Sequence, residues 1–212
     1  MAALFVSTLA SAQGQPSLML HIDQVPAKNV CSSFVPSTDC ADVVVKSPAG
    51  DGLLYNVYLL TATGGDMLSY AGCEFSIFFT EDPAALGMFA WTNCADLQFR
   101  SDDWGDVPVS GSGNLLTFDS INNCQDSDSI VVNGFFYVGA YGDSQMGLGP
   151  RGSSGVMKVA DCSSAEFVLD HNKRSGSIGF GNSGGCNSCL ADCVVPVEET
   201  TWGGVKTLFK GE

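Results

Sequence analysis

The hydrophobic and polar positions along this chain alternate most clearly between residues 73 and 80. Three apolar side chains, Phe75, Ile77 and Phe79, are separated by polar ones such as Glu74. Successive side chains of an extended strand point to opposite faces, so this period of two places the apolar set on one face. The pattern predicts a half-buried β-strand.

Similar short runs recur along the chain, and turn signals rich in Gly and Asp separate them. The runs predict further strands at 42–46, 53–61, 97–100, 115–118, 130–141, 156–160 and 166–169, with turns at 49–52, 63–66, 110–114 and 141–143. The runs 53–61 and 130–141 are apolar on both faces and are expected at the centre of a sheet. The fold class expected is therefore all-β, a mostly antiparallel β-sandwich of the Ig-like or jelly-roll-like kind.

The two ends of the chain differ from this body. Residues 1–12 form a short apolar run that ends in Ala10-Ser11-Ala12, which is typical of a signal peptide cleaved before Gln13. The expected positive start is missing, which leaves open either a start upstream of Met1 or a buried first strand. The β-sandwich domain is expected at 13–195. No later run reaches the ~20 apolar residues of a membrane span.

Residues 196–212 predict a short C-terminal α-helix. Its apolar side chains, Trp202, Val205, Leu208 and Phe209, recur at helical spacing, with acidic residues before them and lysines after them. Two neighbouring glycines weaken the helix by about 1 kcal/mol each, so it needs a surface to dock on. That surface is either its own domain or a partner.

This tail carries a resemblance to a known group of proteins. The string Pro196-Val197-Glu198-Glu199-Thr200-Thr201-Trp202-Gly203-Gly204-Val205-Lys206 follows a strand domain punctuated by cysteines. It resembles the end of uncharacterised exported bacterial proteins that close with a Thr-Trp-Gly-x-Val/Ile-Lys helix. The resemblance implies an exported bacterial protein with a β-sandwich-like body, and it implies no activity.

Nine cysteines in 212 residues bear on the compartment and the cross-linking of the chain. Exported proteins keep disulfides whereas cytosolic ones keep thiols reduced, so a secreted or cell-envelope location is expected. The disulfide candidates are Cys31, Cys40, Cys73, Cys94, Cys124, Cys162, Cys186, Cys189 and Cys193. An odd number leaves at least one unpaired, and that thiol could link two chains.

Spacing alone does not fix the pairing, but three expectations follow from it. Cys31 and Cys40 bracket one short loop, Cys94 and Cys124 end neighbouring segments, and Cys162 can reach the terminal cluster. The alternative for that cluster is a zinc or iron site made by Cys186, Cys189 and Cys193 with Cys162 or His171 as a fourth ligand.

The charge limits the partners. A formal net charge of −14 repels phosphate backbones, so nucleic acid is excluded. No cofactor is expected, and the acidic loops are read first as solvated turns. The alternative is a structural Ca²⁺, because these loops offer the oxygen ligands that it uses. The candidate ligands are Asp102, Asp103, Asp106, Asp126 and Asp128.

Two further sets of residues suggest a function. Trp91, Trp104, Tyr137 and Tyr141 could form an aromatic platform for a sugar or a peptide, and packing in the core explains them equally well. The string Gly181-Asn182-Ser183-Gly184-Gly185 resembles the nucleophile motif of trypsin-like serine proteases, which implies Ser183 as nucleophile and a histidine as base. The rest of that family's pattern is absent, because His21 lies near the mature N-terminus and His171 only 12 residues before Ser183.

The sequence therefore predicts an exported, non-catalytic binding or surface-structural module whose ligand is an extracellular glycan or protein. A secreted hydrolase is the alternative, either a glycosidase with two facing carboxylates or a protease using Ser183. A subunit of an extracellular assembly is a third possibility, in which the odd cysteine or the tail helix supplies the contact.

Overall fold

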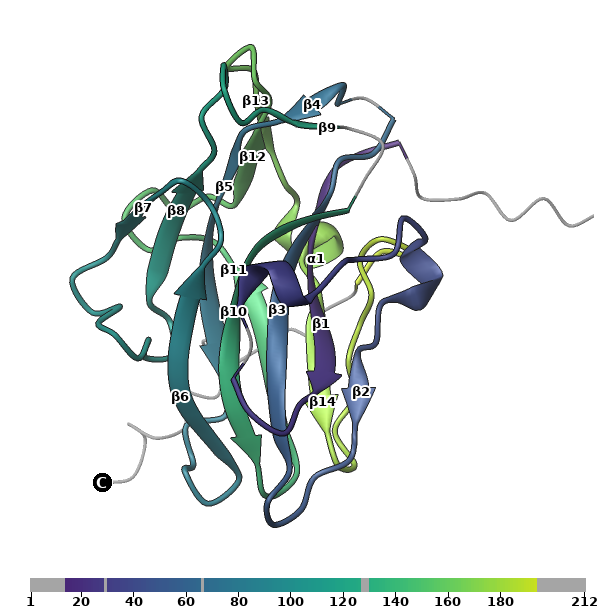
Figure 1. Cartoon of the computed structure of the whole chain (residues 1–212), viewed down its shortest axis with the longest axis vertical. Coiled ribbons are helices and arrows are strands. Elements are labelled where there is room, and N and C mark those ends of the chain that lie inside the picture. The colour runs from purple at the N-terminus through teal and green to yellow at the C-terminus, as the bar shows by residue number, and fades with distance from the viewer. Residues whose placement is uncertain (1–13, 29, 66, 127–129, 194–212) are drawn as a thin grey trace, which may run out of the picture.

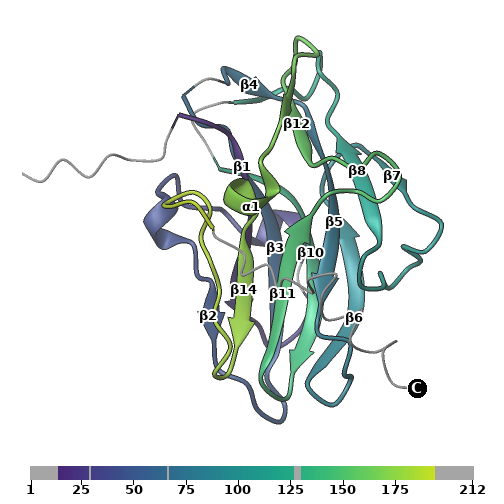
Figure 2. The same ribbon diagram turned by 180° about the vertical axis from the view of Figure 1, so that it is seen from behind.

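Two β-sheets lie face to face and enclose one hydrophobic core (Figure 1). The computed structural model describes residues 14–28, 30–65, 67–126 and 130–193. Sheet A faces the viewer in Figure 1, and sheet B faces the viewer in Figure 2. The architecture is the disulfide-stabilised, mostly antiparallel β-sandwich that the sequence predicts.

Sheet A has four antiparallel strands in the order β1-β3-β10-β6, and β3 and β10 are its central pair. Its strands are β1 (Ser17–Gln24), β3 (Leu54–Ala62), β6 (Leu86–Asn93) and β10 (Ile130–Ala140). The two runs predicted to be central are thus β3 and β10. Nearly all of their residues are buried, because the core covers one face of sheet A and other residues cover much of the second.

Sheet B has eight strands, with β5 at the junction. Strand β5 pairs with β8 along one edge and with β11 and β12 along the other. Its strands are β2 (Lys46–Ser47), β5 (Gly72–Phe79), β7 (Leu97–Arg100), β8 (Gly113–Thr117), β11 (Ser144–Gly149), β12 (Lys158–Ala160), β13 (Glu166–Val168) and β14 (Ser177–Phe180). The pairing of β14 with β2 is parallel, whereas the others are antiparallel.

Smaller elements lie at the rim of the sandwich. A two-stranded sheet joins β4 (Ser69–Tyr70) to β9 (Gln125–Asp126). The helical elements are single turns: the 3₁₀ turns η1 (Cys31–Ser33) and η2 (Cys40–Asp42), and α1 (His171–Arg174). In α1 the carboxylate of Asp170 caps the N-terminus by accepting a hydrogen bond from the N–H of Asn172.

The core between the sheets is rich in aromatic side chains. Phe75 of β5 projects towards sheet A and meets Trp104 edge to face, with ring centroids 5.8 Å apart. Trp104 also meets Trp91 edge to face at 5.5 Å. Aromatic pairs prefer such geometry because the positive ring edge faces the negative π cloud. The alternation of Phe75, Ile77 and Phe79 thus fills the core as predicted.

Four disulfides cross-link the loops around this core. They join Cys31 to Cys94, Cys40 to Cys189, Cys124 to Cys162, and Cys186 to Cys193. The pairing differs from the three expectations drawn from spacing, because loops distant in the sequence meet at the ends of the two sheets. The cysteines of the terminal cluster are all in disulfides, so the proposed zinc or iron site is wrong.

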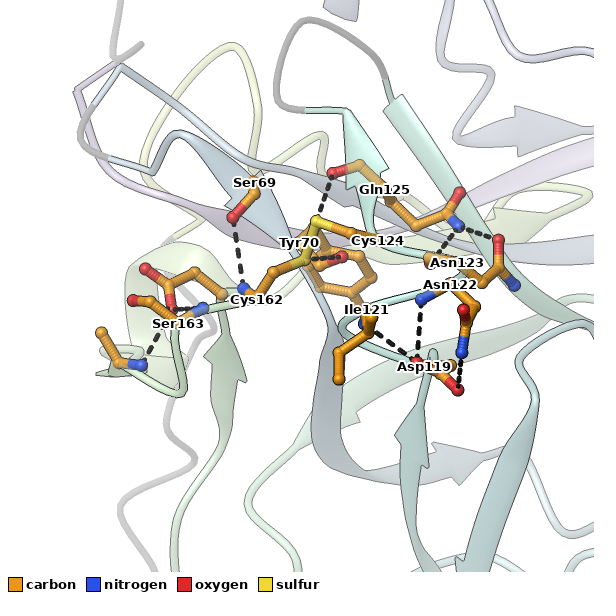
Figure 3. The surroundings of a disulfide bond; sticks show 12 residues. Ser69, Tyr70, Asp119, Ile121, Asn122, Asn123, Cys124, Gln125, Cys162 and Ser163 are labelled. Carbon is orange, nitrogen blue, oxygen red and sulfur yellow. Dashed lines mark hydrogen bonds between the residues drawn. A yellow bond between two sulfur atoms is a disulfide. The ribbon is translucent and has the colours of Figure 1, made fainter.

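The Cys124–Cys162 disulfide shows how one of these links is built (Figure 3). It ties the loop before β9 to the turn after β12 and lies beside Tyr70 of β4. The hydroxyl of Ser69 accepts a hydrogen bond of 3.2 Å from the backbone N–H of Cys162. The disulfide and this hydrogen bond together anchor the two-stranded sheet to sheet B.

All nine cysteines lie in the described part of the chain, and Cys73 is the one left unpaired. It lies in the core at 3 % exposure. A link between two chains through the odd cysteine, which the sequence left open, is therefore wrong for this fold, since no partner thiol can reach it.

Several strand predictions were confirmed and others were wrong. The run 97–100 matches β7 residue for residue, whereas in the predicted strand 42–46 only Lys46 belongs to a strand, the short β2. Strands β1, β6, β11 and β14 were not predicted. The predicted signal peptide (1–12) and tail helix (196–212) lie outside the described residues. No helix in the described residues has the length and apolar character needed to cross a membrane.

Candidate functional site

The outer face of sheet A, the face away from the core, is covered over only part of its area. Residues 30–45 cross it over β10 and β3 and then run past β1 to β2 (Figure 1). Phe34 of this segment stacks on Tyr58 of β3 with ring centroids 4.0 Å apart, and Tyr58 in turn contacts Phe135 of β10. The disulfides of Cys31 and Cys40 hold the segment in place.

The uncovered part of that face carries a cluster of three aromatic side chains, Phe89, Tyr137 and Tyr141, called here the aromatic patch. Tyr137 projects outwards because its neighbours Phe136 and Val138 project into the core. The rings of Phe89 and Tyr137 lie 5.7 Å apart. Phe89 is 41 % exposed and Tyr141 is 37 % exposed, so the patch presents ring surface to solvent.

Two paired glycines form the floor of the patch. Gly87 of β6 lies opposite Gly139 of β10. A Cβ atom on Gly139 would lie 2.6 Å from the hydroxyl oxygen of Tyr141 and 3.1 Å from the ring of Phe89. The two rings therefore approach the bare backbone so closely that only glycine fits at these positions.

A surface groove of about 710 Å³ runs alongside Phe89 and Tyr141. Its walls come from β6, from the turn before it and from the loop between β7 and β8. The lining side chains are mostly apolar and include Phe79, Pro83, Met88, Pro108 and Val109, with Glu81 as the charged one. Exposed Val107, on the same loop, extends the apolar area beyond the groove.

The charges around the site are acidic. Among the described residues, five of the basic side chains form ion pairs with acids: Arg100, Arg151, Lys158, Lys173 and Arg174. The chain as a whole carries 23 acidic residues against 9 basic ones. Glu81 in the groove and exposed Asp82 beside it therefore lie in a negative field.

The structure brings together only half of the aromatic residues that the sequence singled out. Tyr137 and Tyr141 belong to the patch, whereas Trp91 is 9 % exposed and Trp104 is fully buried in the core. An exposed platform that includes the two tryptophans is therefore wrong. Phe89, which lies between the tyrosines, was missed because a β-bulge in the pairing of β6 with β10 interrupts the alternation there.

The acidic residues proposed for calcium do not form one site. Asp106 is paired with Arg100 at 3.6 Å, Asp103 accepts a hydrogen bond from the hydroxyl of Ser101, and Asp126 lies on β9. Asp128 lies outside the described residues. Within 14–28, 30–65, 67–126 and 130–193, no three His, Cys, Asp or Glu side chains gather as metal ligands would.

The serine of the protease-like string sits in a turn after β14. The backbone N–H of Ser183 donates to the carbonyl of Phe180, and the carboxylate of Asp143 accepts hydrogen bonds from Asn182. In the part of the chain that the structure describes, no hydrogen bond joins the Ser183 hydroxyl to a histidine. His21 lies on β1 of the other sheet, and exposed His171 opens α1.

Three described carboxyl groups have a pKa below the ordinary value, whereas a general acid needs a raised one. Backbone N–H groups hold the pKa of Asp119 and Asp143 below the ordinary value, and the hydroxyl of Ser163 does the same for Asp161. A glycosidase needs one carboxyl whose pKa is raised, so these three shifts run in the opposite direction.

No protein-family model matches the chain, and no curated protein sequence does. Solved structures similar in fold include a cohesin module from a Clostridium perfringens family 33 glycoside hydrolase. The sequence identity is 12 %, the match covers 79 % of this chain and 98 % of that chain, and the TM-score is 0.43. Another is the sixth cohesin of Acetivibrio cellulolyticus scaffoldin B, in complex with a dockerin. Its sequence identity is 10 %, the match covers 79 % of this chain and 99 % of that chain, and the TM-score is 0.44.

Proposed function

We propose that this chain is an exported, non-catalytic binding module that holds a segment of a partner protein on the aromatic patch and the adjoining groove. The observation that carries the proposal is the exposure of Phe89 and Tyr141, beside the half-buried ring of Tyr137, at the uncovered end of sheet A. Aromatic side chains are enriched at the centres of protein interfaces, since they bury a large area with few rotatable bonds.

The geometry of the rings favours a protein over a glycan. A sugar ring stacks best on one flat aromatic surface, whereas the rings of Phe89 and Tyr137 are inclined at 55°. The groove beside them is lined by proline, methionine and valine side chains, which suit the irregular apolar side chains of a peptide segment. The sequence also suggested a glycan as ligand, and binding of a glycan is the alternative result of the test below.

The charge of the site indicates the composition of the partner segment. Glu81 is the charged residue of an otherwise apolar groove, and the surrounding surface is acidic. A complementary segment carries apolar side chains for the groove and a lysine or arginine near its edge. Such rim pairs mainly speed association and weaken as salt is added.

The same site suits a subunit of an extracellular assembly, the third possibility drawn from the sequence. Its contact would be non-covalent, because the free thiol of Cys73 is buried. The four disulfides support an oxidising compartment, outside the cell or in its envelope. The proposal includes export of the chain, directed by the predicted signal peptide at 1–12. It also includes the bacterial origin that the resemblance of the tail implies.

The test is to select ligands from a displayed random peptide library and, in parallel, from a glycan array, so that both classes of ligand compete for the site. We expect peptides that combine apolar and basic residues, with a Kd that rises at least tenfold in Phe89→Ser and in Tyr141→Ser. Val168→Ser is the matched control, because Val168 is an exposed apolar strand residue on sheet B and should leave Kd unchanged.

Either of two results would contradict the proposal. Peptides that bind the Phe89→Ser variant as tightly as the wild type would place the interface elsewhere on the molecule. Binding of glycans alone, lost on Tyr137→Ala, would keep the site but replace the protein partner with a carbohydrate. Circular dichroism of each variant confirms that it is folded.

A further inference from the structure

A second depression lies on the outer face of sheet B, along strands β11 and β14, and is called here the β11–β14 trough. Its volume is about 660 Å³. In Figure 2 these two strands run side by side on the face turned to the viewer. The described residues that line the trough are all uncharged, and they include Phe78, Ser110, Gln145, Gly147, Ser177 and Cys193.

The floor of the trough is bare because it is built on glycine. Gly147 of β11 lies between Phe78 of β5 and Ser177 of β14 in the sheet. A Cβ atom added to Gly147 would meet nothing closer than the Cβ of Ser177, at 3.5 Å, so the space above it is open. Phe78 stands beside this gap with 46 % of its surface exposed. Apolar surface is therefore left uncovered here.

The described chain ends at the wall of the same trough. Cys193 lines the trough and is 1 % exposed. Its position is fixed by the disulfide to Cys186 and by the hydrogen bond from its N–H to the carbonyl of Lys173, at 3.1 Å. The neighbouring Asp192 forms an ion pair of 3.5 Å with Arg174. The residues after Cys193 thus start from an anchored point at the edge of an uncharged depression that contains the exposed ring of Phe78.

We propose that residues 194–197 of this same chain occupy the β11–β14 trough. Their sequence is Val194-Val195-Pro196-Val197, which is wholly apolar, and charged residues resume only at Glu198. An extended chain advances about 3.3 Å per residue, so four residues span about 13 Å from Cys193. A segment that packs on the face of a sheet, rather than along its edge, makes no ladder hydrogen bonds. Pro196 has no backbone N–H, so it leaves one fewer hydrogen-bond donor without a partner there.

Covalent attachment favours this occupant over a separate molecule. A segment tethered directly at Cys193 has an effective concentration in the millimolar range or above at the trough, which a free peptide rarely reaches. This inference does not depend on the proposed function, because it needs no partner protein. The aromatic patch lies on sheet A and the trough on sheet B, although the trough and the groove beside the patch share Phe79 and Ser110. On this proposal, residues 194–197 connect the β-sandwich to the predicted tail helix.

The test uses the full mature chain labelled for NMR. We expect nuclear Overhauser contacts between the valine methyl groups of residues 194–197 and the ring of Phe78. In the double variant Val194→Asp/Val195→Asp, these contacts disappear, amide exchange in β11 and β14 speeds up at least tenfold, and the unfolding midpoint falls by about 2–4 °C. The matched control Val205→Asp, which alters the same tail further along, leaves all three readouts unchanged.

A second variant fills the trough without disturbing the tail. Gly147→Val places a side chain in the open space above β11, so it should abolish the methyl contacts to Phe78 while the domain stays folded. Methyl contacts that are absent in the wild type, with exchange unaffected by the aspartate variant, would overturn the proposal. Contacts from Trp202 or Leu208 to Phe78 instead would overturn it in favour of the tail helix as occupant.

Discussion

At the scale of single residues, Cys73 illustrates how burial decides chemistry. Its thiol lies in the core, where loss of hydration disfavours the thiolate and raises the pKa to about 12. The neighbouring hydroxyl of Tyr70 opposes this shift only in part, and the charge of Glu74 adds to it. The ninth cysteine is therefore an inert core residue rather than a reactive one.

This gives a first prediction about thiol reactivity. At pH 8 the thiolate fraction of a group with a pKa of about 12 is roughly 10⁻⁴, so native protein should gain no adduct from iodoacetamide over an hour. After unfolding in guanidinium without reductant, intact mass should show one adduct. Rapid labelling of the native protein, or three to four adducts after unfolding, would contradict the burial of Cys73 or the disulfides.

His21 makes the second residue-scale prediction, which concerns pH. Its Nδ1 accepts a hydrogen bond of 3.1 Å from the N–H of Val44, and its ring lies 5.0 Å from that of Phe34. Burial lowers the pKa of His21, and Asp23 offsets this only partly. Below pH ~6.5 the unfolded chain therefore binds a proton more readily than the folded one, and stability falls until the folded pKa is passed.

The measurement is the unfolding midpoint at pH 7.5 and at pH 5.0. The wild type should lose stability over this interval, and His21→Gln should lose less than half as much. His171→Gln is the control, because His171 is exposed, and it should behave as the wild type does. A wild-type loss that is undiminished in His21→Gln would contradict this role.

At the scale of elements, strand β10 contains a β-bulge between Val132 and Gly134. The extra residue, Asn133, turns its side chain inwards and accepts a hydrogen bond of 2.5 Å from the hydroxyl of Tyr70. Its amide nitrogen donates to the hydroxyl of Thr61 at 2.8 Å. The bulge thus connects sheet A to the small β4–β9 sheet through a buried polar network.

The third prediction tests this network with a double-mutant cycle. Tyr70→Phe should lower the free energy of unfolding by about 1–2 kcal/mol, since it leaves the Asn133 carbonyl without its donor. Combined with Asn133→Ala, the loss should be smaller than the sum of the single losses by at least about 0.5 kcal/mol. Urea unfolding provides all three values, and strict additivity would show that the two side chains do not interact.

The elements also show which parts of the fold can be predicted from sequence. Strands β3, β5, β7 and β10 have enough β-branched or aromatic residues to give a clear pattern. Strands β11 (SQMGLG) and β14 (SIGF) were missed because glycine has no side chain to mark a face. In β6 a bulge interrupts the alternation near Phe89. Trp104 lies in the loop between β7 and β8 and Tyr141 directly after β10, where no strand alternation assigns a side chain to a face. Buried Trp104 and exposed Tyr141 therefore look equivalent in sequence.

At the scale of the whole molecule, three of the four disulfides connect segments that are 38, 63 and 149 residues apart in the sequence. The Cys31–Cys94 link closes a loop with a sequence separation of 63, and Cys186–Cys193 closes one of 7. In the chain-entropy account, the longer loop restricts the unfolded chain more. Such pairings depend on the final packing of both sheets, so local spacing could not predict them.

The fourth prediction compares these two links. Replacing Cys31 and Cys94 together by alanine should lower the free energy of unfolding by about 4 kcal/mol, and the same change at Cys186 and Cys193 by about 2 kcal/mol. Guanidinium unfolding of both double variants gives the comparison. A larger loss from the short loop would show that native contacts of the terminal cluster outweigh chain entropy.

The central claim is that the uncovered end of sheet A binds a partner protein, and oxidative footprinting tests it most directly. The oxidation rates of Phe89, Tyr137 and Tyr141 would be measured by mass spectrometry, free and with a saturating peptide from the displayed library. We expect these three rates to fall at least fivefold on binding, while exposed Phe99 on β7 keeps its rate. Unchanged rates at the aromatic patch, with protection elsewhere, would contradict the account.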